Sequence, residues 1–308
     1  MSTAIYTHPD CQRHDMGDWH PESPARLQAI ADQLIGSHIS DLLDHREAPL
    51  VDPADLARNH SANAIAIVRD NVPAEGDTYP IDADTSLNAW SWRAAQRAAG
   101  AAVAATNAVI DGEIDNAFCS VRPPGHHARP VEPMGFCLFN NVAIAAKHAL
   151  DVRGLQRVAI VDFDVHHGNG TEEAFRNEPR ALMVSFFQHP LYPYCDPQPI
   201  TDHQVNVPVP AYTKGDVVRQ IVTEQWLPAL HAFQPEMIFI SAGFDAHRED
   251  DIGGMGLVEA DYAWITEQMM DVARLYAKGR IVSCLEGGYN LSALGRSVVA
   301  HLKALAEI

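Results

Sequence analysis

The sequence predicts an α/β protein with a parallel sheet that is covered by helices on both faces. From about residue 90 onwards, short apolar and β-branched runs alternate with longer segments of helical periodicity. The strand-like runs are apolar throughout, as expected for strands that are buried on both faces. No low-complexity linker and no internal repeat divides the chain. We therefore expect a single domain.

The elements are expected in strand–helix alternation. The first 85 residues are rich in Pro, Asp and His and are expected to form helices and long loops. An Ala-rich helix over 88–110 is expected to pack deep against the sheet. A Pro-rich stretch over 190–210 is expected to be a long connection, and such connections are often functional. The expected strands are 116–121, 157–162, 181–186, 236–242 and 280–285, and the other expected helices are 139–150, 214–233, 259–277 and 291–306.

The composition limits the classes of partner. The 308 residues include 22 Lys and Arg against 40 Asp and Glu, for a formal net charge of −18. This charge repels phosphate backbones and argues against a direct nucleic-acid partner, whereas a lysine side chain or a polyamine is compatible with it. No apolar run is long enough for a membrane span, and no signal peptide is visible. The five cysteines lack paired spacing, so we expect reduced thiols and a cytoplasmic location.

Polar clusters follow four of the predicted strands. In open parallel sheets, ligands bind outside the carboxyl ends of the strands. We therefore expect the four clusters to converge on one pocket, although each by itself is also compatible with ordinary core packing. The clusters are 122–127, 162–170, 241–247 and 286–289.

The second and third clusters contain the residue types of a metal site. Asp162, Asp164 and His166 alternate along one extended segment, so their side chains share a face. Asp164 and His166, together with Asp245, would supply two carboxylate oxygens and one imidazole nitrogen. Three protein ligands with an open position are typical of a catalytic metal, and these donors suit Zn²⁺, with Fe²⁺ as the alternative. A hydrogen-bonded Asp/His network is the competing interpretation.

The other clusters supply acid–base groups. A metal-activated water needs a base, and the leaving group needs an acid. His126 and His127 are candidates for these tasks, with Asp162 as the obvious partner of one imidazole and Asn169 as a neutral partner for the other. Tyr289 follows two glycines and would stabilise an oxyanion, unless it is only a packed turn residue.

Aromatic residues near these clusters predict a narrow slot. Gly135 and Phe136 follow the histidine pair closely, and Tyr192 lies in the Pro-rich stretch. Two facing aromatic rings would grip an aliphatic chain. Ordinary loop packing is the alternative for Tyr192.

These residues resemble the arginase-deacetylase superfamily, and most closely the class II histone deacetylases and their bacterial relatives. The resemblance implies a single deacetylase-like catalytic domain over 1–308, with a central, mostly parallel eight-stranded sheet and helices on both faces. The matching segments span nearly the whole chain in the family's order and are 20–27, 122–128, 135–141, 162–171, 241–246 and 286–289.

The resemblance also implies roles for single residues. In the family the second histidine of the pair does the acid–base work and the first is an electrostatic partner, and Tyr289 matches the tyrosine that polarises the amide carbonyl. The implied assignments are Zn²⁺ on Asp164, His166 and Asp245; pairs His126–Asp162 and His127–Asn169; a structural K⁺ around Asp162, Asp164, His166, Ser185 and Phe186; substrate contacts at Gly135, Phe136 and Tyr192; and a rim carboxylate at Asp84.

Two departures from the family pattern bear on function. Asn169 stands where class I enzymes carry Asp, which fits class II and should leave His127 less basic. Ile252 stands where polyamine-specific relatives carry an acidic gatekeeper, although the acidic residues 249–251 are close by in the sequence.

We therefore expect a zinc-dependent deacetylase that hydrolyses the amide of acetyl-lysine or a related acyl-lysine. An acetylpolyamine or other small-molecule amidohydrolase is the first alternative, and a non-catalytic acyl-lysine binding module is the second. The expected partner is an acetylated peptide, protein or small amine, and assembly into a homo-oligomer is left open. Arginase-type chemistry is disfavoured because the ligands indicate one catalytic metal rather than two.

Overall fold

The computed structural model describes residues 2–308 and confirms a single α/β domain around one eight-stranded sheet. The strand order is β2-β1-β5-β10-β9-β6-β7-β8, and every pairing in it is parallel. The strands are β1 (Thr3–Thr7), β2 (Asp44–Glu47), β5 (Asn116–Cys119), β6 (Val158–Asp162), β7 (Ala181–Gln188), β8 (Gln204–Val209), β9 (Met237–Ala242) and β10 (Ile281–Leu285). Two further strands, β3 (Tyr79–Pro80) and β4 (Ser86–Leu87), form a separate antiparallel pair.

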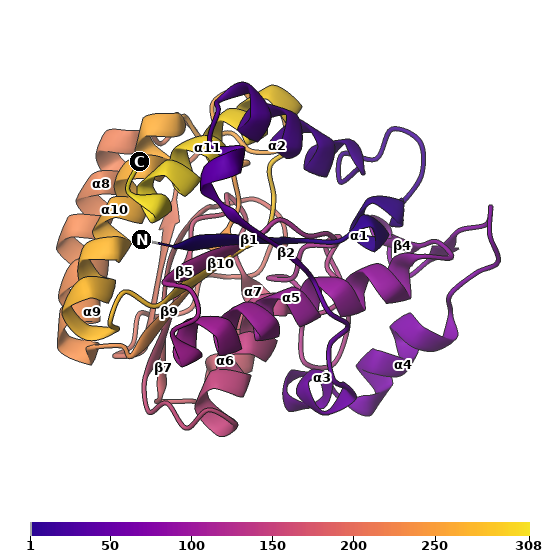
Figure 1. Ribbon diagram of the computed structural model, residues 1–308, viewed down its shortest axis with the longest axis horizontal. Coiled ribbons are helices and arrows are strands. Elements are labelled where there is room, and N and C mark those ends of the chain that lie inside the picture. Colours follow the sequence, from indigo (N-terminus) through magenta and orange to yellow (C-terminus); the bar gives the residue numbers. More distant parts are fainter. Residues whose placement is uncertain (1) are drawn as a thin grey trace.

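Helices cover both faces of the sheet (Figure 1). The layer that contains α2, α10 and α11 covers one face, and the layer that contains α5 and α6 covers the other. All five central strands, from β5 across to β7, are fully buried, which explains why they are apolar throughout. The helices are α1 (Pro9–Arg13), α2 (Ala25–Gly36), η1 (Ser40–Leu42), α3 (Pro53–Asn59), α4 (Ala62–Asp70), α5 (Ser91–Asp111), α6 (Asn141–Asp151), α7 (Asn169–Phe175), α8 (Gly215–Ile221), η2 (Val222–Trp226), α9 (Leu227–Phe233), α10 (Glu259–Tyr276) and α11 (Leu291–Ala306).

Three strands of the sheet differ from the expectation for their segments. β1 and β2 lie in the first 85 residues, which were expected to form only helices and loops, and β8 lies inside the expected long connection over 190–210. β2 and β8 are the two edges of the sheet. β2 has the sequence Asp-His-Arg-Glu and is largely exposed, so it carries no apolar signal and is a strand only because it pairs with β1.

The predicted helix over 214–233 is three consecutive segments. A π-helical turn, η2, separates α8 from α9. Pro228 stands in the first turn of α9 and has no N–H to donate to the preceding turn. The missing hydrogen bond accounts for the local change of helical pitch.

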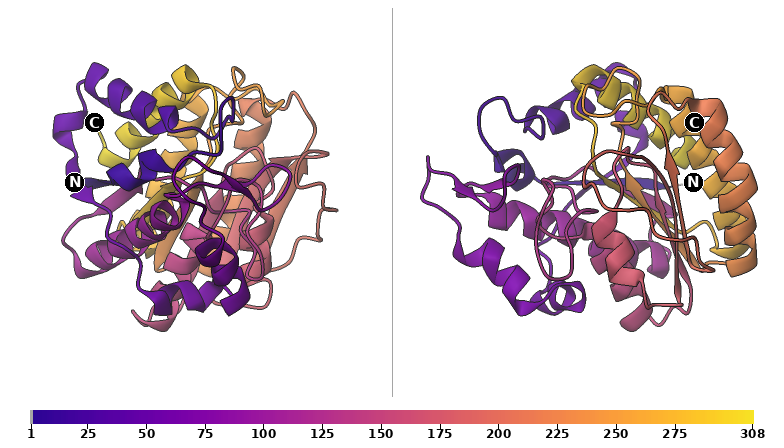
Figure 2. Two further views of the ribbon diagram at one scale, coloured as in Figure 1. Left: turned by 90° about the vertical axis from the view of Figure 1, so that its right-hand side faces the viewer. Right: turned by 180° about the vertical axis from the view of Figure 1, so that it is seen from behind.

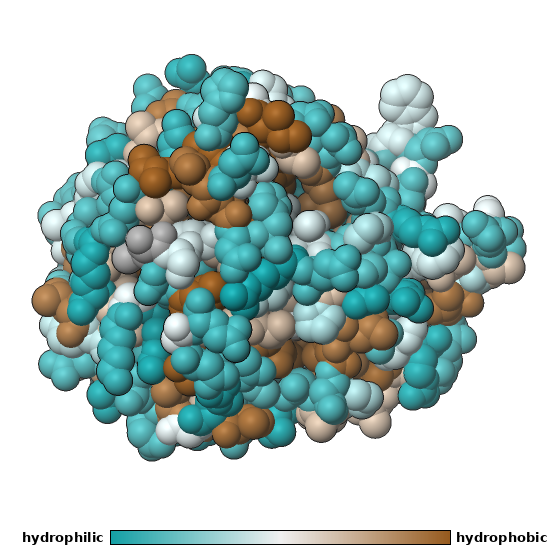
Figure 3. All heavy atoms as spheres, viewed as in Figure 1, coloured by the Kyte–Doolittle hydropathy of each residue, from teal (hydrophilic) through white to brown (hydrophobic). Residues whose placement is uncertain are grey.

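The carboxyl ends of the strands carry the loops that matter for function. β5, β10, β9 and β6 are consecutive neighbours in the sheet, so the loops that follow them meet at one edge, which the left view of Figure 2 faces. The space-filling view shows a mainly hydrophilic surface with separate hydrophobic groups on the face of Figure 1 (Figure 3). Among residues 2–308, no helix is both long and apolar enough to cross a membrane.

Candidate active site

Two carboxylates and one imidazole meet at the ends of β6 and β9. Asp164 and His166 follow β6, and Asp245 follows β9. One potential ligand atom from each residue lies within 4.8 Å of the others. Nδ1 of His166 is 3.0 Å from Oδ1 of Asp164 and 3.1 Å from Oδ2 of Asp245. The three residues that the sequence singled out as ligands therefore form one buried cluster.

The electrostatics of this cluster fit a divalent cation. Burial and the neighbouring charge of Asp164 raise the pKa of Asp245 to about 7. Burial alone would lower the pKa of His166, but its hydrogen bonds with the two carboxylates outweigh burial and raise the pKa to about 9. Two buried carboxylates thus share the proton of one imidazole, and a metal ion would replace this proton with a larger charge.

Glycine next to the cluster is a steric requirement. The Gly287 N–H donates to Oδ2 of Asp164 over 2.9 Å. A Cβ atom on Gly287 would lie 2.0 Å from Oδ2 of Asp245. The main chain after β10 can therefore approach both carboxylates only because this residue has no side chain.

His126 lies behind the cluster in an ionic environment. It donates from Nδ1 to Oδ2 of Asp162 over 3.0 Å. Burial opposes its protonation, but Asp164 and Asp162 outweigh burial and hold the pKa of His126 well above its usual value. The surroundings of His126 therefore favour its protonated form more than those of His127 do.

His127 lies in surroundings that favour the neutral imidazole. Its Nδ1 donates to Oδ1 of Asn169 over 2.8 Å, so the lone pair of the neutral ring is on Nε2. Burial, followed by the charges of His126 and His166, holds the pKa of His127 well below its usual value. A neutral imidazole with a free Nε2 is the form that accepts a proton.

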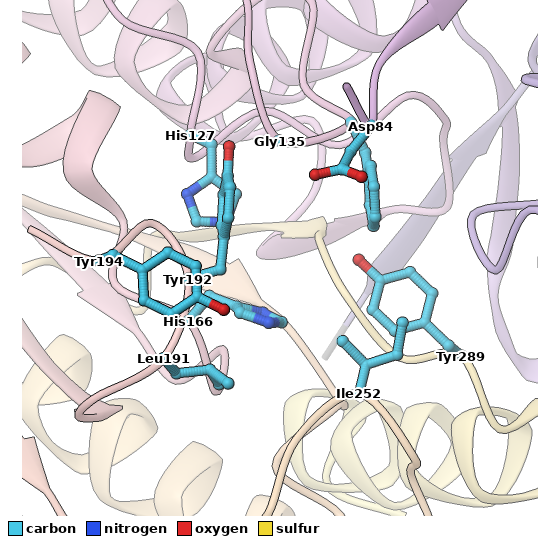
Figure 4. Close-up of a pocket in the computed structure, with 10 residues that line it drawn as sticks. Asp84, His127, Gly135, His166, Leu191, Tyr192, Tyr194, Ile252 and Tyr289 are labelled. Carbon is cyan, nitrogen blue, oxygen red and sulfur yellow. The ribbon is translucent and has the colours of Figure 1, made fainter. Parts of the chain in front are cut away.

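A cavity of about 290 Å³ opens beside these residues. His127 and Tyr289 lie on different sides of it with His166 between them, and the Tyr289 hydroxyl is directed into the pocket (Figure 4). The Tyr192 and His127 rings meet edge to face with their centroids 5.1 Å apart. The lining residues are Asp84, His127, Gly135, Phe136, His166, Leu191, Tyr192, Tyr194, Ile252 and Tyr289.

The two aromatic residues expected to form a slot both line this cavity. Gly135 has a φ of 57°, and a Cβ there would lie 2.8 Å from both the His127 and the Tyr192 rings. The phenyl ring of Phe136 stands edge to face with Tyr289 at a centroid distance of 5.9 Å. The exposed Asp84 lies at the mouth. All the residues expected to contact substrate are thus brought together.

The buried guanidinium group of Arg26 contacts Tyr289 and the residue before it. The guanidinium carbon of Arg26 lies 4.9 Å from the centre of the Tyr289 ring, and its Nε donates to the Gly288 carbonyl over 2.7 Å. Burial, followed by the charge of Asp245, holds the pKa of Tyr289 well above its usual value. The phenol therefore remains a hydrogen-bond donor.

The residues expected around K⁺ lie at adjacent strand ends. Asp162 is the register partner of Ser185 across β6 and β7. The Ser185 hydroxyl donates to Asn206 over 2.8 Å, and the Phe186 ring is stacked on Trp226. The segment from Asp162 to His166 therefore runs beside both residues.

Glu286 was part of an expected cluster, but no role was predicted for it. Its Oε2 accepts the N–H of Gly125 at 2.6 Å and of His126 at 3.0 Å, and Oε1 accepts from Ser241 at 3.0 Å. This buried carboxylate fixes the turn that carries the histidine pair. A lone acidic residue directly after an apolar strand was the available signal.

Glu22, Arg26 and Arg122 form a fully buried ionic group beneath the site. Arg26 donates to Glu22 over 3.0 Å, and Arg122 donates to the same carboxylate. Burial would raise the pKa of Glu22, but the two guanidinium groups outweigh it and lower the pKa to about 2. The sequence signal for this group was the presence of Glu22 and Arg26 in one matching segment, but their partner was not predictable.

Replacing Glu22 by Gln is expected to destabilise the fold by about 3–5 kcal/mol, because two buried cations lose their counter-charge. Since the pKa of Glu22 is lowered on folding, its contribution is present above about pH 4.5 and is lost as the pH falls towards 2. Denaturant unfolding at neutral pH measures the loss. Asp70→Asn, which breaks the exposed Arg69–Asp70 pair, is the control and should leave the denaturant midpoint of unfolding unchanged. Equal, small changes in the free energy of unfolding of the Glu22 and Asp70 variants would contradict the prediction.

The fold and the site define a class of protein: a parallel α/β domain with a candidate metal cluster, a histidine pair and a tyrosine at the carboxyl edge of its sheet. A model of the histone deacetylase domain family matches residues 20–305. The chain is 35% identical to the histone deacetylase-like amidohydrolase of Pseudomonas aeruginosa, over 88% of this chain and 73% of that protein. The crystal structure of the HDA15 HD domain superposes with a TM-score of 0.91 and 32% identity, covering 100% of this chain and 89% of that one.

The chain belongs to the histone deacetylase family of hydrolases. It is also 34% identical to type-2 histone deacetylase 2 of Dictyostelium discoideum over 99% of its own length. It spans only 21% of that relative.

Proposed function

We propose that this protein is a zinc-dependent deacetylase that hydrolyses the amide of acyl-lysine side chains. The observation that carries the proposal is the arrangement around the cavity. His127 presents a free Nε2, Tyr289 presents a phenol donor, and the Asp164–His166–Asp245 cluster lies beside them. An amide carbonyl in this cavity would have a base on one side and an oxyanion donor on the other.

Asp164, His166 and Asp245 would hold the metal. Two carboxylates and one imidazole suit Zn²⁺, with Fe²⁺ as the alternative. When bound, the metal supplies Lewis-acid chemistry, which lowers the pKa of water and polarises a carbonyl. The register of Ser185 against Asp162 supports the further proposal of a structural K⁺ in this region.

The protein's own groups then perform the proton transfers. His127 accepts the proton of the attacking water at Nε2 while the water oxygen bonds to the amide carbon. Tyr289 donates a hydrogen bond to the oxygen of the tetrahedral intermediate. The C–N bond breaks as a protonated imidazole returns this proton to the amine. The carboxylic acid formed then passes its own proton to the amine, which leaves a carboxylate and an ammonium group. His126, which donates to Asp162, would act as the electrostatic partner beside His127.

The shape of the cavity supports an extended aliphatic substrate. Phe136 and Tyr192 line its walls, and Leu191 and Ile252 add apolar surface. A lysine side chain is apolar along its methylene groups and would fit between these rings. The mouth bears the exposed carboxylate of Asp84, which would accept hydrogen bonds from a peptide main chain.

The experiment compares turnover of an acetyl-lysine peptide and an acetylated polyamine by zinc-loaded protein. We expect peptide turnover that a Tyr289→Phe variant loses. Turnover of the polyamine alone would replace the proposal with a metabolic amidohydrolase. Bound zinc with neither substrate hydrolysed would favour an acyl-lysine binding module.

All five cysteines are free, which supports the proposed cytoplasmic location.

Ile252 at the cavity is expected to disfavour polyamines, because it offers no negative charge to their distal ammonium groups. Ile252→Glu should raise kcat/KM for the acetylated polyamine about fivefold over Ile252→Gln, the effect of an ion pair worth about 1 kcal/mol. The Gln variant controls for side-chain size and polarity. Equal polyamine turnover by the two variants would show that the charge at this position does not select substrate.

A further inference from the structure

One buried carboxylate outside the metal cluster and the histidine pairs binds the main chain of two loops at the cavity. Asp250 is only 6% exposed. Its Oδ2 accepts the N–H of Tyr289 at 2.6 Å and the N–H of Asn290 at 2.9 Å. Its Oδ1 accepts the N–H of Ile252 at 3.1 Å. Three main-chain donors therefore converge on one side chain.

These contacts join two loops that are distant in the sequence. Asp250 and Ile252 lie in the loop after β9, whereas Tyr289 lies in the loop after β10. Asn290 is the N-cap of α11, where the helix dipole favours a negative charge. Hydrogen bonds to an ionised acceptor are roughly twice as strong as those between neutral groups. The main chain that carries the Tyr289 phenol is therefore held by charge as well as by geometry.

Other contacts keep the loops together without Asp250. The Asn290 side chain donates to the Glu249 carbonyl over 2.9 Å, and Arg296 of α11 donates to the Glu249 carboxylate over 2.8 Å. Arg26 holds the Gly288 carbonyl from the opposite side. Removal of the Asp250 carboxylate therefore leaves α11 attached and releases the N–H groups of Ile252, Tyr289 and Asn290.

We propose that Asp250 is a positioning residue that fixes the Tyr289 phenol for oxyanion stabilisation and links its placement to Ile252 at the cavity. This inference rests on the proposed function of Tyr289. Asp250 does not line the cavity, so it acts through the main chain of Tyr289. A displacement of about 1 Å in a reacting group can cost about 10²-fold in rate.

A double-mutant cycle with Asp250→Ala and Tyr289→Phe tests the proposal on zinc-loaded protein. We expect Asp250→Ala to lower kcat by about 10- to 10²-fold, with KM and zinc content unchanged. In the Tyr289→Phe background the same change should cost less than about twofold, because no phenol is left to position. Asp250→Asn retains one oxygen acceptor for Tyr289 and should restore most of kcat. Asp251→Ala, at the exposed neighbour, is the matched control and should have no effect.

A second measurement does not depend on turnover. Amide hydrogen exchange over 286–292 should accelerate in Asp250→Ala and not in Asp251→Ala, because only the former frees the N–H groups of Tyr289 and Asn290. Equal fold-losses in the two Tyr289 backgrounds, an unchanged kcat or unchanged exchange would overturn the inference. Failure of the proposed function is distinct, since it would be seen as absent turnover in the wild type. The exchange result would then decide the inference by itself.

Discussion

Asp245→Ala is expected to abolish metal binding and hydrolysis together. The change leaves only Asp164 and His166 as protein ligands, and it removes one of the two carboxylates whose buried charge favours a cation. Two remaining ligands do not form the three-ligand set of a catalytic zinc site. Zinc per chain, measured by elemental analysis after dialysis, should fall to background along with turnover of the acetyl-lysine peptide.

Two further variants separate ligand loss from misfolding. Asp245 also accepts the Val165 N–H over 2.9 Å, so Asp245→Asn keeps an acceptor for this bond while removing the charge. It should remain folded and still bind zinc poorly. Asp251→Ala in the same loop should retain zinc and activity. Stoichiometric zinc with full turnover in Asp245→Ala would exclude Asp245 as a ligand.

Tyr289→Phe is expected to lower kcat by about 10²-fold or more, which is the scale of losing one oxyanion donor. The ring and its contacts with Phe136 and Arg26 remain, so zinc content and the unfolding midpoint should not change. Steady-state kinetics with the acetyl-lysine peptide measure the effect. Tyr212→Phe, which removes the hydroxyl of an exposed tyrosine, is the control. An unchanged kcat in Tyr289→Phe would remove this phenol from the mechanism.

These variants and those at Asp250 probe successive layers of the same site. Asp245 would hold the metal, Tyr289 would stabilise the charge that develops on the substrate, and Asp250 would hold Tyr289 in place. The expected losses decrease in that order, because each layer acts on the reaction less directly.

The five central strands of the sheet, from β5 across to β7, were predictable from the chain alone. The five expected strands match β5, β6, β7, β9 and β10 to within two residues at either end. They are buried on both faces, so their apolar runs are continuous and easily recognised. The edge strands β2 and β8 were not found, because an edge strand gains its pairing from one neighbour and needs no apolar run of its own. The inner strand β1 was also missed, since its five residues lie in the less regular first 85 residues.

The contacts within the polar clusters were largely predictable as well. Asp164, His166 and Asp245 were expected to meet because they follow strands of one parallel sheet, and they do meet. The pairings of His126 with Asp162 and of His127 with Asn169 are present as hydrogen bonds. Their catalytic roles and the identity of the metal stay predictions that the experiments above address.

The sequence by itself determined the fold class, the edge of the sheet where the polar groups gather and the residue types available there. It could do so because strand burial and strand direction are written in local patterns of apolar and polar residues. Only the tertiary structure decided the supporting contacts: Glu22 beneath two arginines, Glu286 beneath the histidine turn and Asp250 between Ile252 and Tyr289. These carboxylates bind groups in other loops, and a partner in another loop depends on the path of both loops through space, which no local pattern records.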